Sequence, residues 1–123
     1  MLATSELIAF VATTDAARAR AFYADTLGLR LVSDDPFALV FDANGTTLRI
    51  AKVQELTPAG YTVLGWHVAD IVAAANALIG AGVPTLRFDG MAQDQLGIWT
   101  SPGGGRIAWI HDPDGNTLSI TQG

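Results

Sequence analysis

The feature that most constrains this chain is a β-hairpin pattern that occurs twice. Near the C-terminus, residues 109–120 place two short β-type runs on either side of an Asp-Pro-Asp-Gly-Asn cluster. Proline fixes one φ angle, glycine allows a positive φ, and Asx side chains bond to nearby backbone groups, so this cluster predicts a turn. Residues 41–50 align without a gap on residues 111–120, and half of these ten positions are identical. The chain therefore looks like two copies of one structural unit.

The same order of elements is expected before each hairpin. In the first copy, Asp15 is the expected N-cap of a helix that stops at Gly28. In the second copy, Asp70 takes the capping position and Gly80 ends the helix. Strands are predicted at residues 7–12, 29–33, 37–41 and 47–53, and again at 61–68, 83–88, 106–110 and 117–121, with 96–100 as a further extended segment.

These patterns predict the α+β class and a single domain over residues 1–123. Module one spans residues 5–53, a linker spans 54–60, and module two spans 61–123, with each module of the form βαβββ. A ferredoxin-like dimeric barrel is the alternative fold, but its βαββαβ order does not place a hairpin at the same offset after each helix.

Composition limits the partners that such a chain can have. The 123 residues are 50% hydrophobic and 15% charged, which predicts a folded chain and favours a homodimer that covers apolar surface. The net charge of −5 and only seven Lys and Arg residues argue against nucleic acid and against an anionic membrane surface.

The absence of cysteine removes several kinds of chemistry together. Disulfides, thiolate nucleophiles and sulfur-ligated metals are all excluded, since the chain has no cysteine. The first ten residues carry no basic segment before an apolar run, and no apolar stretch approaches the length of a membrane span. A cytoplasmic protein is therefore expected.

The motifs, taken in order, carry a resemblance to a known family. Ala21-Phe22-Tyr23 and Leu27-Gly28-Leu29 follow Asp15, Trp66-x-Val68 precedes Asp70-Ile71, and Asp-Pro-Asp-Gly-Asn occupies residues 112–116. In this order the chain resembles the vicinal oxygen chelate superfamily of glyoxalases, bleomycin-resistance proteins, fosfomycin-resistance enzymes and extradiol dioxygenases. The resemblance runs from about Leu7 to Thr121. It implies two βαβββ modules whose eight strands form a curled mixed sheet around a cavity, and it implies a homodimer.

The resemblance also implies where a divalent metal would be held, and this chain departs from that pattern. The usual ligand positions, two in each module, carry Ile8, Arg49, Val63 and Ser119. Two hydrocarbons, a guanidinium and a hydroxyl cannot hold a divalent ion, because such sites need several converging nitrogen or carboxylate ligands. We therefore predict no metal and no other cofactor.

Period-two alternation from these positions predicts the side chains that face the cavity. The expected ligand-binding residues are Phe10, Leu39, Phe41, Arg49, His67, Trp109, His111 and Ser119, with Thr117 on the same face as Ser119. Mainly apolar and aromatic residues with a few polar groups are typical of a small-molecule site.

Four of the expected cavity residues, Arg49, Trp109, His67 and His111, each allow two interpretations. Arg49 either contacts an anionic or carbonyl group of a ligand, or it lies at the rim or in an internal ion pair. Trp109 either stacks on a planar ligand or fills the core. His67 and His111 are candidate acid–base residues, but ordinary strand-end histidines would occupy the same positions. Asp112 and Asp114 are expected to form the turn.

The favoured function is binding of a small, partly planar organic molecule without a metal, with an anionic ligand as one option. The alternative is a lyase, isomerase or dioxygenase-like enzyme that uses atypical metal ligands or a histidine base. A third reading is an interaction or regulatory subunit whose barrel is packed shut.

Overall fold

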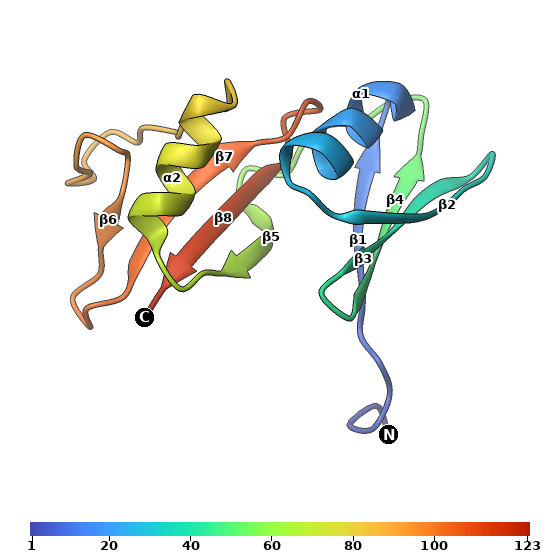
Figure 1. Cartoon of the computed structure of the whole chain (residues 1–123), viewed down its shortest axis with the longest axis horizontal. Coiled ribbons are helices and arrows are strands. Elements are labelled where there is room, and N and C mark those ends of the chain that lie inside the picture. The colour runs from blue at the N-terminus through green and yellow to red at the C-terminus, as the bar shows by residue number, and fades with distance from the viewer. The chain divides into compact units, whose positions relative to one another are not determined.

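The computed structural model describes residues 1–123, which divide into two compact units, Met1–Thr57 and Pro58–Gly123. The boundary lies within residues 54–60, where the sequence predicts a linker. Each unit contains one four-stranded mixed sheet together with its own helical segment (Figure 1). The α+β class and the two βαβββ modules are confirmed, with the eight strands hydrogen-bonded as two separate sheets.

The first unit follows the predicted order of elements. Its elements are β1 (Ile8–Thr13), α1 (Ala16–Arg20), the π-helical segment η1 (Ala21–Thr26), β2 (Arg30–Asp34), β3 (Ala38–Ala43) and β4 (Thr46–Lys52), with sheet order β1-β4-β3-β2. The Asp15 side chain accepts a hydrogen bond from the Arg18 amide at 3.1 Å, and Gly28 leaves the helix with a φ of 77°. The predicted cap and stop of this helix are therefore both confirmed.

The core of the first unit lies between η1 and one face of the sheet. The rings of Tyr23 and Phe41 have centroids 6.0 Å apart, and both side chains are fully buried. Leu39, Leu48 and Ile50 complete this core. Removing a large apolar side chain from water in this way stabilises the fold by about 1.5–3 kcal/mol for each residue.

The second unit repeats the plan with one change. Its elements are β5 (Thr62–His67), α2 (Ile71–Gly80), β6 (Trp99–Thr100), β7 (Arg106–His111) and β8 (Thr117–Gln122), with sheet order β5-β8-β7-β6. The helix α2 lies across β7 and β8 (Figure 1). Asp70 caps α2 by accepting from the Ala73 amide at 3.1 Å, and the Gln122 side chain accepts from the Ile71 amide at 2.8 Å. The cap prediction is confirmed here as well.

The strand predicted at residues 83–88 does not form, and the segment after it contributes only the two residues of β6. Pro84 has no N–H group to donate to a ladder. Along this stretch one backbone hydrogen bond reaches the sheet, from the Leu86 amide to the Trp109 carbonyl at 2.8 Å. Residues 83–98 therefore leave the sheet and return to it at β6; we call them the excursion.

The turn between β7 and β8 is built as predicted. Asp112 is buried, and its carboxylate accepts hydrogen bonds from the amides of Asp114 and Asn116 at 3.0 and 2.9 Å. The Asn116 side-chain amide donates to the second carboxylate oxygen at 2.8 Å. Asp112 and Asp114 thus both form hydrogen bonds within the turn, as predicted. No helix in the structure has the length and apolar character that crossing a membrane requires.

Candidate functional site

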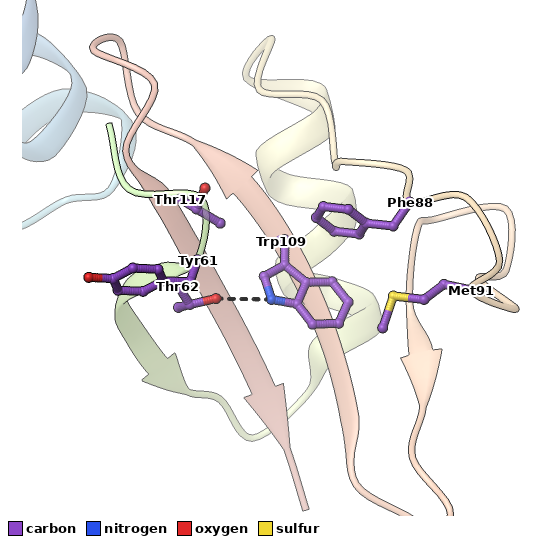
Figure 2. A pocket seen from close by; sticks show the side chains of 7 residues that line it. Tyr61, Thr62, Phe88, Met91, Trp109 and Thr117 are labelled. Carbon is purple, nitrogen blue, oxygen red and sulfur yellow. Dashed lines mark hydrogen bonds between the residues drawn. The ribbon is translucent and has the colours of Figure 1, made fainter. Parts of the chain in front are cut away.

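A pocket lies on the second unit, on the face of its sheet that α2 does not cover. Its volume is about 300 Å³, at the lower end of the range for small-molecule sites. It is lined by Gly60, Tyr61, Thr62, Phe88, Met91, Trp109 and Thr117 (Figure 2). None of these side chains carries a charge, and four of them are aromatic or a thioether, so the pocket suits an apolar or aromatic group.

Trp109 is held in place on several sides. Its indole N–H donates to the Thr62 hydroxyl at 3.1 Å, as the dashed line in Figure 2 shows. The Phe88 ring meets it edge-on with centroids 5.3 Å apart, and the Trp99 ring lies tilted at 6.4 Å. These contacts satisfy the indole's only donor and fix its plane, which leaves ring surface that a planar ligand can contact.

The register of the second sheet places the predicted residues of this unit on one face. Trp109 lies opposite Ser119, His111 lies opposite Thr117, and His67 lies beside Thr121. Of these, Trp109 and Thr117 line the pocket. The two histidines are exposed, and His111 adjoins the pocket through its partner Thr117.

In the first unit the structure separates the predicted residues into two groups. Phe10 and Arg49 are partners in the β1–β4 ladder, and Val40 is the partner of Arg49 in β3. Phe10 is 59% exposed, so this face of the sheet is open within the unit. The expectation that Leu39 and Phe41 share the face is wrong, because both are fully buried against the helical side.

The physical reason for this error is the length of the two hairpin loops. The pair Asp42–Thr47 encloses residues 43–46, whereas the equivalent pair His111–Thr117 encloses residues 112–116. The ungapped alignment ignores this extra residue, and a slip of one residue moves a whole strand to the opposite face. The true counterpart of Trp109 is therefore Val40. Val40 lies opposite Arg49 in the first unit, as Trp109 lies opposite Ser119 in the second.

Arg49 is half-buried and takes no part in the ion pairs of the unit, which join Asp34 to Arg20 and Lys52 and join Arg30 to Asp42. The internal ion pair expected as one alternative is therefore not formed. Its charge acts at longer range on Asp35. The amides of Phe37 and Ala38 hold the pKa of Asp35 below its ordinary value, and Arg49 and Lys52 lower that pKa further.

The sequence model of the Glyoxalase/Bleomycin resistance protein/Dioxygenase superfamily matches residues 7–120. The chain belongs to this superfamily. No curated protein matches the chain. Among solved structures, a superfamily member from Sphaerobacter thermophilus is 25% identical, with a TM-score of 0.78 and complete coverage of both chains.

Two other solved structures with the same fold illustrate the functions that it carries. The lactoylglutathione lyase from Agrobacterium tumefaciens is 18% identical with a TM-score of 0.76, covering 98% of this chain and 94% of the other. TnmS3, an antibiotic binding protein from Streptomyces sp. CB03234, is 24% identical with a TM-score of 0.73, covering 99% and 98%. At these identities the likeness establishes the shared fold, so the site must decide the function.

The residues at this superfamily's metal positions do not fit a divalent ion. Ile8 lies beside Thr47, Arg49 lies between Phe10 and Val40, and Ser119 lies between Gly65 and Trp109. The fourth position, Val63, lies at the irregularity between Thr62 and Leu64 in the β5–β8 ladder. No three His, Asp or Glu side chains come together anywhere in the structure. A hydroxyl and a guanidinium are not a donor set for such an ion.

The pocket contains residues that the sequence interpretation did not select. Tyr61 and Thr62 lie where the linker ends, and Phe88 and Met91 lie on the excursion. The signal available for Phe88 and Met91 was that residues 81–98 are long compared with residues 27–29, which join helix and strand in the first module. Long connections in compact domains are frequently functional, so this length asymmetry was the informative feature.

Proposed function

We propose that this superfamily member is a metal-free small-molecule binding protein that takes a planar aromatic group against Trp109. The proposal rests on one observation: the Trp109 indole is held in a fixed position in a pocket whose lining side chains are all uncharged. The volume of about 300 Å³ suits a small ring system or one part of a larger ligand. The likeness to an antibiotic binding protein supports a binding role on this fold.

The charge of the ligand is a separate part of the proposal. Arg49 has no ion-pair partner, so it is available to a carboxylate, phosphate or polarised carbonyl. It belongs to the first unit, whereas the pocket around Trp109 offers only neutral groups. We therefore propose that ring stacking at Trp109 supplies the affinity of the pocket, and that Arg49 is a contact of its own on the first unit for a negatively charged group.

A matched set of planar probes tests both parts. Acridone is neutral, acridone-4-carboxylate is anionic and 9-aminoacridine is cationic, while the tricyclic plane is common to all three. A probe at about a hundred times its Kd stabilises the fold by ~2.7 kcal/mol. For a domain of this size that raises Tm by roughly 3–6 °C per kcal/mol, which a thermal-shift measurement resolves.

Tryptophan variants locate the binding. Trp66 lies beside the buried Ile120, on the helix-covered face of the sheet, so Trp66→Phe is the matched control for Trp109→Phe. We expect acridone to quench fluorescence in Trp66→Phe as in the parent protein, and to bind more weakly with little quenching in Trp109→Phe. Acridone binding that is unchanged in Trp109→Phe would contradict the proposal for the pocket. An affinity for acridone-4-carboxylate that is unchanged in Arg49→Met would contradict the proposal for Arg49.

An enzyme with a histidine base is the second candidate, and one observation favours it. His111 lies directly opposite Thr117, a pocket residue, so its imidazole is close enough to this region to merit a test. Turnover of a candidate substrate that is lost in His111→Ala and kept in His67→Ala would support that function. Saturable binding without turnover would support the binding protein.

We further propose a cytoplasmic homodimer. Ile8 and Phe10, which are 50% and 59% exposed, and Phe37, which is 75% exposed, leave apolar surface that a second copy can cover. Native mass spectrometry of the purified protein measures subunit number, retained metal and retained ligand together. A monomer at micromolar concentration, or one stoichiometric divalent ion per chain, would contradict the corresponding part of the proposal.

A further inference from the structure

The excursion supplies one wall of the pocket although it contains no regular strand. Phe88 and Met91 face the indole from one side, while Tyr61 and Thr62 lie on the other (Figure 2). Phe88 is 41% exposed, and its edge-on contact with Trp109 covers only part of the ring. Exposed apolar side chains on a loop tend to collapse onto neighbouring apolar surface. Some other interaction must therefore hold this wall where it is.

The Gln93 side-chain amide provides that interaction through three hydrogen bonds. Its Nε2 group donates to the carbonyls of Leu86 and Gly97, and its Oε1 atom accepts from the Phe88 amide, each at 2.8 Å. Only this orientation of the amide satisfies all three, since two partners are acceptors and the third is a donor. The Gln93 amide thus joins both ends of the excursion and bonds directly to the backbone of Phe88.

The amide takes the place of a missing β-strand. In a parallel ladder, one residue accepts and donates to residues two apart on the neighbouring strand. Gln93 does the same with its side chain, bonding to the Leu86 carbonyl and the Phe88 amide. Its own backbone forms an antiparallel bridge with Trp99 of β6, which connects it to the sheet. The backbone near Phe88 is therefore connected to the sheet through the Gln93 side chain as well as through the Leu86 amide, which donates to the Trp109 carbonyl.

Neighbouring groups hold the rest of the excursion. The Arg87 guanidinium donates to the carbonyls of Asp94 and Gln95, and the Asp94 carboxylate accepts from the amides of Leu96 and Ile98, both at 2.9 Å. These bonds lie within residues 87–98 and shape the loop. Gln93 is the side chain that bonds to the Phe88 amide itself.

We infer that Gln93 is the positioning residue of this pocket, holding Phe88 and Met91 at the distance from Trp109 that keeps the pocket open to a planar ligand. The inference rests on the proposed function for its ligand-binding consequence. The position of the wall is a separate property, and it can be measured with no ligand present.

The experiment uses the full chain with Trp66→Phe and Trp99→Phe, so that Trp109 is the only fluorophore of its kind. Acrylamide quenching reports the accessibility of the indole, and titration with acridone reports affinity. Gln93→Leu removes all three hydrogen bonds with little change in side-chain size. Gln95→Leu is the matched control, because the Gln95 side chain is exposed and forms no hydrogen bond in the same loop.

We expect Gln93→Leu to change the acrylamide quenching of Trp109 and to weaken acridone binding roughly fivefold to tenfold, as losing a net hydrogen bond or slightly more would do. Gln95→Leu should change neither. A Gln93→Leu variant that melts at a lower temperature but keeps parental quenching and affinity would overturn the inference, because the role of Gln93 would then be structural only.

Gln93→Glu adds a second measurement, the pH dependence of Trp109 quenching and of acridone affinity, which a purely structural role would not change. The introduced carboxylate faces the carbonyl oxygens of Leu86 and Gly97, which raises its pKa above the ordinary glutamate value of about 4.3. Below that raised pKa the protonated group can donate to one carbonyl. Quenching and affinity of Gln93→Glu should therefore move towards parental values as the pH is lowered, while the parent protein sets the baseline.

The pH result also covers the case in which Gln93→Leu fails to fold, because Gln93→Glu retains the bond from the Phe88 amide. No change with pH in Gln93→Glu, relative to the parent, would overturn the inference. If acridone binds to no variant, the proposed function fails for this ligand class. The acrylamide measurement would still decide whether Gln93 positions the wall.

Discussion

The two units have the same order of elements and the same sheet topology, and they differ at one edge of the sheet. In the first, β2 pairs with β3 from Arg30–Asp42 to Asp34–Leu39, and all three ion pairs of the chain lie in this unit. In the second, the corresponding edge is divided between Leu86, which lies within the excursion, and the short strand β6, which follows it. The pocket occurs on the unit with the divided edge. The repeated βαβββ unit thus provides the sheet, and the excursion, which has no counterpart in the first unit, provides one wall of the pocket.

The hairpins differ in a way that changes which residues face outwards. Asn44 and Gly45, with φ values of 51° and 94°, close the first hairpin in a two-residue turn, whereas the second uses the Asp112-centred turn. The extra residue of the second loop sets Trp109 on the open face, where the first unit has Val40. At this position of the open face the second unit therefore carries a tryptophan where the first carries a valine.

The largest expected effect tests this assignment of faces. Phe41→Ala should destabilise the fold by about 3–5 kcal/mol, because the ring is fully buried against Tyr23. Phe10→Ala should cost about 1 kcal/mol or less, since its side chain is 59% exposed. Urea denaturation of both variants measures the difference. A Phe41→Ala variant that loses only roughly 0.5 kcal/mol, as an exposed substitution does, would show that Phe41 faces the cavity as the ungapped alignment places it.

Much of the fold could be predicted because its signals are local. Asp15 and Asp70 mark helix starts through side-chain capping, and the Asp-Pro-Asp-Gly-Asn cluster marks a turn through its own hydrogen bonds. Each of these bonds joins residues close in sequence, so the sequence pattern contains the interaction. The face of β3 was less predictable, because it depends on one residue of loop length.

The site was only partly predictable for the same reason. Trp109 could be selected because its strand and alternation are local features of β7. The length of residues 81–98 marks their segment as unusual, but it does not single out Phe88 and Met91, because their positions depend on the Gln93 side chain bonding to backbone several residues away. A glutamine within a loop carries no pattern that distinguishes a structural amide from an exposed one, as its neighbour Gln95 shows.

The second prediction concerns whether the excursion is a fixed part of its unit. Gly97 has a φ of 81°, and a Cβ atom there would lie 2.7 Å from Thr85 Cβ. Gly97→Ala should therefore cost about 2–4 kcal/mol, combining left-handed strain with overpacking. Gly90, in the same excursion, has a φ of 80° and open space around it, so Gly90→Ala should cost only about 1 kcal/mol. Equal losses would indicate that the excursion relaxes freely.

The third prediction compares equivalent positions on the open faces. Phe10 and Arg49 are partners in the first unit, while Gly65 and Ser119 are partners in the second. A Cβ at Gly65 would lie 2.5 Å from the Ser119 hydroxyl, which must then rotate away. Gly65→Ala should cost about 1 kcal/mol alone and less in a Ser119→Ala background, a coupling measurable by a double-mutant cycle. Additive effects would show that the two side chains do not compete for this space.

The smallest effect tests the ion pairs that only the first unit has. Asp34 accepts from Lys52 at 2.6 Å and from Arg20 at 3.2 Å, and the Lys52 hydrogen bond, with help from Arg20, holds the pKa of Asp34 below its ordinary value of 3.8. A carboxylate with a lowered pKa in the folded state contributes stability that is fully present above the unfolded-state value. That contribution is lost as the pH falls through the folded-state value.

Asp34→Asn should therefore lower the urea midpoint slightly at neutral pH, and its difference from the parent should shrink as the pH falls below 3.8. The effect is small because both pairs are solvent-exposed, and added salt should reduce it further. Asp25→Asn is the control, since Asp25 is exposed and has no ion pair. A difference between Asp34→Asn and the parent that stays constant down to low pH would mean that the carboxylate charge contributes nothing, and the contrast in ion pairing between the units would have no energetic consequence.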